Sequence, residues 1–460
     1  MRCTSSISTV FLSFCFLLLA TRAIAQTTYQ TLGQSFKYPF TTSSHYTSSV
    51  LFSNLTNPHG LTFDTYGNIL VVERGVGITA FSPAPVVNPL GAWQRKVLVS
   101  NSALTGAIAH EDGKIYVTTN SQALIYLYDE DNVEVGGSFA DSYPVVTGLP
   151  SAGEPIHTIR LEKASNGNVI ALIIGTGPPT TWTSTSSSDY SQVRRFPFPS
   201  IVSLVFPPPA MTWSSGQILA KGVRNPTSFA FAPDDSAKLY ILENSMGITG
   251  INGITSTFGN QNPADELNLV ILPTPTSTGL LAPPTATITP KPFGHPDCVT
   301  LWDPQADPVG VPQYTASSRG AQMSVGSQTN SWCQNTNNNV PPVLYFEPHS
   351  LPADITFYEG VLEEDGPVNP FGDSYIGSAF VAMRGASSGF GVAVIGFPLS
   401  VPPPTGGWLP YEYILQAWDL DACPDECIGP GGVAFGRDGH LYVTSESTGE
   451  LFVVERLWIF

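Results

Sequence analysis

The stretch GLTFDTYGNILVVE, from Gly60 to Glu73, has the pattern of a short strand, a tight glycine turn and a second strand. The Gly67-Asn68 step supplies the positive φ angle that a hairpin turn needs. The stretch therefore predicts a β-hairpin. Because the same pattern recurs along the chain, it decides the fold.

Five further copies of this unit follow the first. Their turns contain Asp112-Gly113, Asn166-Gly167, Pro233-Asp234 and Asp438-Gly439, and one looser copy lacks such a turn. The copies span residues 106–119, 158–174, 228–243, 354–383 and 432–446, with further short strands after each, such as 123–128 and 450–455. Six repeated four-stranded sheets predict an all-β, six-bladed β-propeller. A seven-bladed ring and a β-sandwich are the alternatives. A propeller binds ligands at one end of its central channel.

The composition supports a loop-rich β protein. The 460 residues include 42 Gly and 41 Pro, and only 12 % are charged. This excludes a coiled coil, which needs charged heptads without proline, and disfavours a helical bundle, because proline and glycine break helices. The hydrophobic share of 42 % is enough for a large core.

The first residues have the pattern of a secretory leader. Arg2 precedes an apolar run at residues 10–20, and Ala23-Ile24-Ala25 forms a small-x-small cleavage site. The run is too short to span a bilayer. We expect a signal peptide at residues 1–25 and a secreted mature protein, residues 26–460, that forms a single propeller domain.

Loss of this leader would remove Arg2 and Arg22 and take the formal net charge from −17 to −19. A surface this acidic repels nucleic acid and anionic membranes, so neither is expected as a partner. Neutral ligands suit such a surface, whereas an anionic ligand needs a local cluster of Arg or Lys.

Four cysteines lie outside the leader, and an even number in a secreted chain predicts two disulfides. Cys423 and Cys427 are close enough to close a small loop, which leaves Cys298 to pair with Cys333. A zinc site is the weaker interpretation, because no histidine pair stands at ligand spacing beside them. Asn54, in Asn54-Leu55-Thr56, is the one clear glycosylation sequon.

Polar residues just before two of the units are candidates for chemistry. His157 stands at the start of the third unit, and a histidine with a pKa near neutrality can act as a general base. A structural, hydrogen-bonded histidine is the alternative. Arg224 and Asn225 precede the fourth unit and could polarise a carbonyl oxygen or hold a carboxylate. A salt bridge followed by a turn would explain them equally well.

A carbonyl-rich loop with nearby acids follows the fourth unit, from Glu243 to Met246 and again at residues 262–268. Oxygen ligands of this kind suit Ca²⁺, although the spacing matches no EF-hand. The remaining candidates are basic residues near unit ends: Arg74, Arg194, Arg195, His349 and Arg384.

In their order along the chain, these segments resemble the glucose/sorbosone dehydrogenase family of soluble quinoproteins, and most of all its secreted fungal pyranose dehydrogenases. The motifs that carry the resemblance are VVERG (71–75), HTIRL (157–161), VRNPTSFAF (223–231), LEN (242–244), NPADELNLV (262–270), FGHPDC (293–298), PPVLYFEPHS (341–350) and GDSYIGSAFVAMRG (372–385).

The resemblance implies a pyrroloquinoline quinone lying across the channel mouth, with Ca²⁺ bridging it to the protein. By this match His157 takes the proton from the anomeric hydroxyl of an aldose or pyranose, whose C1 is oxidised to a lactone by hydride transfer to the quinone. Electrons then pass to a separate acceptor, such as a secreted cytochrome or a lytic oxidase. The resemblance places Arg224 and Asn225 beside the quinone oxygens and the metal at the backbone carbonyls of Ser245 and Met246. It places Arg74, His349 and Arg384 near the cofactor.

The chain departs from the family pattern at two positions that matter. Bacterial relatives have an aspartate soon after the catalytic histidine, where this chain has Gly175-Thr176-Gly177. The family's cofactor-binding lysine is replaced by Tyr358-Glu359. There are two alternative functions. One is a propeller lactonase with a metal held by side-chain carboxylates and Asn. The other is a non-catalytic carbohydrate-binding propeller that has lost the cofactor, as the missing lysine and aspartate permit.

Overall fold

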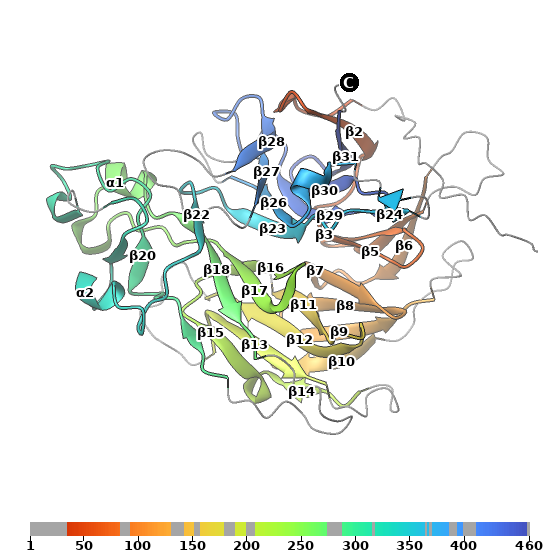
Figure 1. Ribbon diagram of the computed structural model, residues 1–460, viewed down its shortest axis with the longest axis horizontal. Coiled ribbons are helices and arrows are strands. Elements are labelled where there is room, and N and C mark those ends of the chain that lie inside the picture. Colours follow the sequence, from red (N-terminus) through yellow and green to blue (C-terminus); the bar gives the residue numbers. More distant parts are fainter. Residues whose placement is uncertain are drawn as a thin grey trace, which may run out of the picture.

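The computed structural model describes residues 35–82, 93–129, 142–150, 157–178, 189–198, 208–273, 288–314, 318–363, 366–367, 370–385, 393–398 and 411–457. The predicted leader, residues 1–25, lies outside these ranges. Six sheets are arranged radially around a central channel (Figure 1). The predicted six-bladed propeller is confirmed, and the seven-bladed and sandwich alternatives are wrong.

Each blade is an antiparallel sheet whose first strand lines the channel. Blade 1 comprises β3 (Pro58–Phe63), β4 (Ile69–Glu73), β5 (Gly77–Ser82) and β6 (Gln94–Ser100). Blade 2 comprises β7 (Leu104–Glu111), β8 (Lys114–Thr119), β9 (Gln122–Leu127) and β10 (Ser142–Thr147), with the short β14 (Met211–Thr212) parallel at its edge. Blade 3 comprises β11 (Thr158–Lys163), β12 (Val169–Thr176), β13 (Gln192–Pro197) and β15 (Gln217–Lys221), with β19 (Lys291–Pro292) parallel at its edge.

The other three blades follow the same plan. Blade 4 comprises β16 (Pro226–Ala232), β17 (Asp235–Glu243), β18 (Asp265–Ile271) and β22 (Leu344–Phe346). Blade 5 comprises β23 (Pro352–Phe357), β26 (Ser378–Met383), β27 (Ala393–Pro398) and β28 (Glu412–Ala417), and β1 (Phe40–Thr42) adds a fifth strand. Blade 6 comprises β29 (Pro430–Phe435), β30 (Leu441–Ser445), β31 (Glu450–Arg456) and β2 (Tyr46–Phe52).

The ring closes by pairing the two ends of the chain. Strand β2 comes before blade 1 in the sequence, yet it is the outer strand of blade 6, where Tyr46 pairs with Arg456. Hydrogen bonds from the second strand of one blade to the start of the next blade also link the blades. The hydroxyl of Thr444 donates to the carbonyl of His59, and that of Thr118 donates to the carbonyl of His157.

The six repeated units coincide with the two innermost strands of the six blades. Their turns have the positive φ angles that the sequence predicts: Gly67 has φ 85°, Asp112 and Gly113 have φ 48° and 64°, and Gly439 has φ 74°. Asp112 and Gly113 form a two-residue connection, whose positive φ angles match the twist of the strands it joins. Gly67 and Gly439 lie in longer connections, residues 64–68 and 436–440.

The core lies between the blades. Each of the six interfaces between neighbouring blades has its own apolar cluster, such as Leu70 and Val72 of blade 1 against Ile115 and Val117 of blade 2. The middle strands are covered on both faces, and all five residues of β4 and all six of β26 are buried. This burial explains their continuous apolar runs.

Blade 4 carries the largest described insertion, which projects from one side of the ring (Figure 1). It contains α1 (Ser256–Asn260), α2 (Asn330–Cys333) and the β20–β21 pair (Cys298–Thr300 and Gln322–Ser324), with an apolar cluster of its own. The disulfide Cys298–Cys333 ties β20 to α2, and Cys423–Cys427 closes the predicted small loop. Both predicted pairings are confirmed. A two-stranded pair, β24 (Leu362–Glu363) and β25 (Gly366–Pro367), is attached to blade 5.

The register of the inner hairpins places the candidate residues at one end of the channel. The first residue of an inner strand pairs with the last residue of the next strand, as in Pro58 with Glu73 and Pro226 with Glu243. Residues that precede an inner strand or follow a second strand therefore share one end, which we call the strand-start end. In the described part of the chain, no helix has the length and apolar character of a membrane span.

Candidate active site at the strand-start end of the channel

His157 lies immediately before β11 and is 1 % exposed. Its Nε2 atom lies 3.1 Å from the carbonyl oxygen of Asn120. A carbonyl only accepts hydrogen bonds, so Nε2 carries the proton and Nδ1 carries the lone pair of the neutral ring. Burial lowers the pKa of His157, and the hydrogen bond to Asn120 opposes this shift only in part. The imidazole is thus held neutral with one basic nitrogen, which is the form that a general base needs.

Arg224 and Asn225 lie before β16 in the neighbouring blade, also at the strand-start end and also buried. The backbone N–H of Arg224 donates to Glu243 at 2.6 Å. Its Nη1 donates to the carbonyls of Asn244 and Ser245 at 3.2 and 3.0 Å. The sequence thus predicts correctly that His157 and Arg224 face the same end from adjacent blades.

The two glycines that stand where the family has its aspartate lie against Asn225 and Pro226. A Cβ atom at Gly177 would lie 2.6 Å from Asn225 Oδ1, and one at Gly175 would lie 2.7 Å from the ring of Pro226. No side chain fits at Gly177 while Asn225 keeps its place, nor at Gly175 while Pro226 keeps its place. The partner of His157 is instead the backbone carbonyl of Asn120, which has no side-chain signature in the sequence.

The predicted metal carbonyls are arranged differently from the expectation. The carbonyl of Ser245 accepts Arg224 Nη1 at 3.0 Å, and Met246 is 2 % exposed within the core of the insertion. A cation bound to the Ser245 carbonyl would stand beside a guanidinium group, so Ca²⁺ would bind there only after Arg224 moved away. The described residues also contain no group of three or more His, Cys, Asp or Glu side chains able to hold a metal. The calcium site stays a prediction, and no step below depends on it.

Arg74 and Arg384 come from blades 1 and 5 and meet at one carboxylate. Oε1 of Glu446 lies 3.5 Å from Nη2 of Arg74, and Oε2 lies 3.2 Å from Nη1 of Arg384. The same Oε1 lies 3.1 Å from Nε2 of His59. Arg74 also donates from Nε to the carbonyl of Thr105 at 2.8 Å. We call His59, Arg74, Arg384 and Glu446 the Glu446 cluster.

Two further histidines flank the site. His349 has a φ of 60°, and its Nε2 lies 3.3 Å from the carbonyl of Gly259 in α1. Its ring therefore bridges the strand-start end and the insertion. His295 is bonded through its backbone N–H to Gly222 at 3.0 Å. Burial, with a smaller contribution from the charge of Arg224, lowers the pKa of His295 to about 3.

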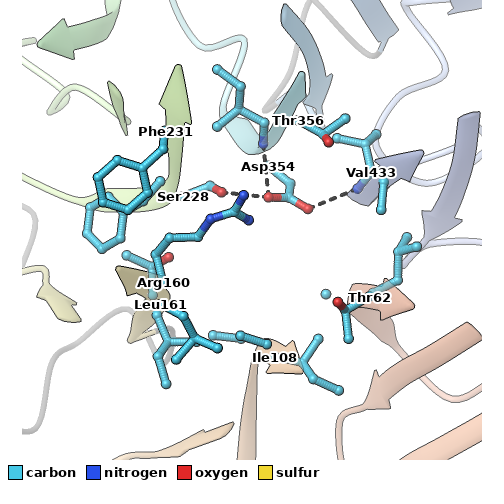
Figure 2. Close-up of a pocket in the computed structure, with 18 of the residues that line it drawn as sticks. Thr62, Ile108, Arg160, Leu161, Ser228, Phe231, Asp354, Thr356 and Val433 are labelled. Carbon is cyan, nitrogen blue, oxygen red and sulfur yellow. Dashed lines mark hydrogen bonds between the residues drawn. The ribbon is translucent and has the colours of Figure 1, made fainter. Parts of the chain in front are cut away.

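One cavity of about 560 Å³ lies at the strand-start end where blades 1 and 2 meet, and is lined by Arg74, residues 101–105, residues 119–122 and Leu124. Another, of about 480 Å³, lies in the central channel and runs along the inner strands. In it Arg160 points across the channel toward Asp354, whose carboxylate accepts bonds from Ser228 of blade 4 and the N–H of Val433 of blade 6 (Figure 2). Asp354 thereby ties three blades together.

Buried polar atoms without a hydrogen-bond partner gather at the strand-start end. Among the described residues these include Nδ1 of His157, Oδ1 of Asn225, Oδ1 of Asn244 and Nε of Arg384. Native proteins satisfy nearly all such atoms, so a group of them in one place marks a ligand site. The three guanidinium groups suit a ligand that carries carboxylates and carbonyl oxygens. The unpartnered ring nitrogen and amide oxygens accept hydrogen bonds and suit hydroxyl groups.

The sequence misses three members of this end of the channel. His59 stands immediately before the first unit, as His157 stands before the third, so the same signal could have found it. Glu446 ends the last unit, where nothing local separates it from strand residues. Asn120 acts through its backbone. Gly106 stands against the His59 ring, because a Cβ atom there would lie 2.9 Å from Cγ of His59.

These features define a six-bladed propeller with a buried base and a cationic ligand site at one mouth of its channel. The chain belongs to the TrAA12-like family, whose model matches residues 40–457.

Among curated proteins, the chain is 25 % identical over 415 residues to a pyrroloquinoline quinone-dependent sugar dehydrogenase of Hypocrea jecorina, covering 88 % of this chain and 87 % of that protein. It is 25 % identical over 446 residues to a pyrroloquinoline quinone-dependent pyranose dehydrogenase of Coprinopsis cinerea. That match covers 92 % of this chain, but this chain spans only 55 % of the longer Coprinopsis protein.

Solved structures share the fold. The calcium structure of a Trichoderma reesei enzyme of carbohydrate-active family AA12 superposes with a TM-score of 0.73 at 24 % identity, covering 92 % of this chain and 98 % of that one. The holo form of the pyranose dehydrogenase quinone domain from Coprinopsis cinerea gives a TM-score of 0.72 at 21 % identity, covering 91 % and 97 %.

Proposed function

We propose that this protein is a quinoprotein sugar dehydrogenase that binds pyrroloquinoline quinone at the strand-start end and oxidises an aldose or pyranose at C1 to the lactone. The observation that carries the proposal is the gathering of one neutral, buried imidazole, three guanidinium groups and unpartnered amide oxygens at this end. The names of the Hypocrea and Coprinopsis relatives support the same cofactor and substrate class.

The residues present fit the quinone. The carboxylates of the quinone need arginine donors. Arg74 and Arg384, which both contact Glu446, offer such donors. Arg224 and Asn225 lie beside each other and would contact the quinone oxygens, where negative charge develops on reduction. When bound, the quinone supplies the carbon that accepts a hydride from C1 of the sugar.

His157 would hold the proton that leaves the sugar. The Asn120 carbonyl fixes the Nε2–H tautomer, so the lone pair on Nδ1 accepts the proton of the C1 hydroxyl as the C–H bond breaks. The lowered pKa of His157 keeps this nitrogen unprotonated at neutral pH.

The remaining expectations belong to this proposal. Secretion follows from the leader at residues 1–25, and glycosylation follows from Asn54, which is exposed beside an exposed Thr56. The electrons would leave to a separate acceptor, such as a secreted cytochrome or a lytic oxidase. No observation in the described residues favours the lactonase, which needs a cluster of acidic metal ligands.

Quinone titration tests the proposal. Purified protein is titrated with pyrroloquinoline quinone, with and without Ca²⁺, and followed by absorbance and calorimetry. Dye reduction is then measured with a panel of aldoses and, as a control, their lactones. Saturable quinone uptake with sugar-dependent dye reduction is expected. Uptake without turnover would support the quinone site but not the oxidation of these sugars. An absence of uptake would reject the quinoprotein function and favour the propeller that has lost the cofactor.

A further inference from the structure

The Glu446 cluster brings together side chains from three blades. His59 and Arg74 come from blade 1, Arg384 follows β26 of blade 5, and Glu446 follows β30 of blade 6. The carboxylate is placed by a glycine, because a Cβ atom at Gly431 would lie 2.8 Å from Cγ of Glu446. The fold therefore holds the Glu446 carboxylate in place between the two guanidinium groups at the strand-start end.

The cluster carries a net positive charge. Burial lowers the pKa of His59 to about 3, so its imidazole is neutral. Burial alone would raise the pKa of Glu446, but His59, Arg384 and Arg74 together bring it below its usual value. Two guanidinium groups thus share a single carboxylate, and the side chains of Arg74, Arg384 and Glu446 are only 23 %, 21 % and 17 % exposed.

The donors of Arg384 are not saturated. Arg384 contacts Glu446 through Nη1 alone, and its buried Nε has no acceptor among the described residues. Arg384 therefore does not make the two-bond fork with Glu446 that a dedicated arginine–carboxylate pair forms. The geometry suits a pair of arginines that binds a carboxylate of a ligand and that contacts the carboxylate of Glu446 when no ligand is bound.

We propose that Arg74 and Arg384 form a carboxylate-binding site that Glu446 occupies in the free protein, so that a ligand carboxylate binds only when Glu446 gives up part of its contact with them. In the context of the proposed function, the ligand is a carboxylate of the quinone. Glu446 then sets the affinity for the cofactor, because its charge repels the carboxylate and competes for the same donors.

The test compares Glu446→Gln with Glu455→Gln. Both variants remove one negative charge, but Glu455 lies at the other end of blade 6, beside His440. Quinone affinity is measured by fluorescence and calorimetry, without turnover. We expect Glu446→Gln to bind quinone about tenfold more tightly than the wild type and Glu455→Gln to match the wild type. Equal affinity in all three proteins would overturn the proposal.

A second probe separates this inference from the proposed function. Malonate carries two carboxylates and no quinone chemistry, and its binding is followed by calorimetry and by the rise in melting temperature. We expect Glu446→Gln to bind malonate about tenfold more tightly than the wild type and Arg384→Gln to lose this binding. If malonate shows these effects but no variant takes up quinone, the carboxylate site stands and the quinoprotein function fails.

A different outcome would reject the role of Glu446 while the proposed function stands. Quinone uptake by the wild type, with Glu446→Gln unchanged toward both quinone and malonate, would leave the function standing and reject the role of Glu446. Should Glu446→Gln fail to fold, as judged by circular dichroism, Arg384→Gln carries the test alone. Its affinity for quinone should fall about tenfold, and an unchanged affinity would count against the site.

Discussion

Two arginines of this protein show how differently a guanidinium group can be held. Arg195, in β13 of blade 3, donates from Nε and Nη2 to the two oxygens of Glu162 at 2.5 and 3.0 Å, and from Nη1 to Gln217 at 3.1 Å. Arg384, at the strand-start end, makes one 3.2 Å contact with Glu446 and leaves its buried Nε without an acceptor in the described residues. A saturated fork stabilises the fold, whereas an unsaturated one is available to a ligand.

The sequence does not distinguish the two. Arg195 and Arg384 are both basic residues near strand ends in a chain poor in cations. The difference lies in the partners, Glu162 and Glu446, which are distant in sequence and become neighbours only through the sheets. We therefore expect substitutions at saturated polar groups to change the stability of the fold, and substitutions at unsaturated polar groups to change ligand binding or turnover.

The largest effect is expected at His157, whose Nδ1 is buried and unpartnered. Replacement of His157 by Ala should lower turnover by about 10²–10⁴-fold, because the proton of the sugar hydroxyl loses its acceptor. Quinone affinity should stay within about twofold, since the imidazole touches the sugar rather than the carboxylates of the cofactor. Stopped-flow dye reduction and quinone titration measure the two quantities. Turnover that survives the substitution would assign the base elsewhere, and His59 would be the next residue to test.

The opposite result is expected for the saturated pair. Glu162→Gln leaves Arg195 buried without its counter-charge and should cost about 3–5 kcal/mol of unfolding free energy. Quinone affinity of the folded fraction should not change. Urea unfolding followed by fluorescence gives the stability. A cost below about 1 kcal/mol would mean that this fork resembles an exposed salt bridge.

Gly177 tests the fit around Asn225. Gly177→Ala would place a methyl group 2.6 Å from Asn225 Oδ1. We expect a loss of about 1–3 kcal/mol of stability and a displaced Asn225, with weaker quinone binding. Gly67→Ala, in a remote turn with nothing near its Cβ position, is the matched control for the added methyl group. Its cost comes only from its φ of 85°, so its quinone affinity should equal that of the wild type.

The pH dependence of stability probes His295. The pKa of its buried ring is lowered to about 3, whereas an unfolded histidine titrates near 6.5. The unfolded state binds the proton first, so stability is lost as pH falls from about 6.5 toward 3, by up to about 1.4 kcal/mol per pH unit. His295→Gln should remove this slope. Parallel stability curves for the two proteins between pH 7 and 4 would contradict the lowered pKa.

Most of the fold could be predicted from the sequence, because each inner hairpin is a local unit with its own glycine turn. The closing strand β2 could not, since its pairing with β31 joins residues about 400 positions apart and leaves no local signal. For the site, His157, Arg224 and Arg384 could be found as polar residues beside strand ends. Their partners could not: Asn120 acts through a backbone carbonyl, and Glu446 becomes relevant only when the ring brings blade 6 against blades 1 and 5.

The smallest effect is expected at the opposite end of the channel, where Lys163 of β11 pairs with Glu111 of β7. The Lys163 side chain is 47 % exposed, so water screens this pair and its two long side chains lose entropy in forming it. Glu111→Gln should change the unfolding free energy by less than about 1 kcal/mol and leave quinone affinity unaltered. Like Glu446→Gln, the Glu111→Gln substitution removes one negative charge, but it does so at the other end of the channel. A matching gain in quinone affinity would show that the effect of Glu446 comes from the net charge of the protein, rather than from its place between Arg74 and Arg384.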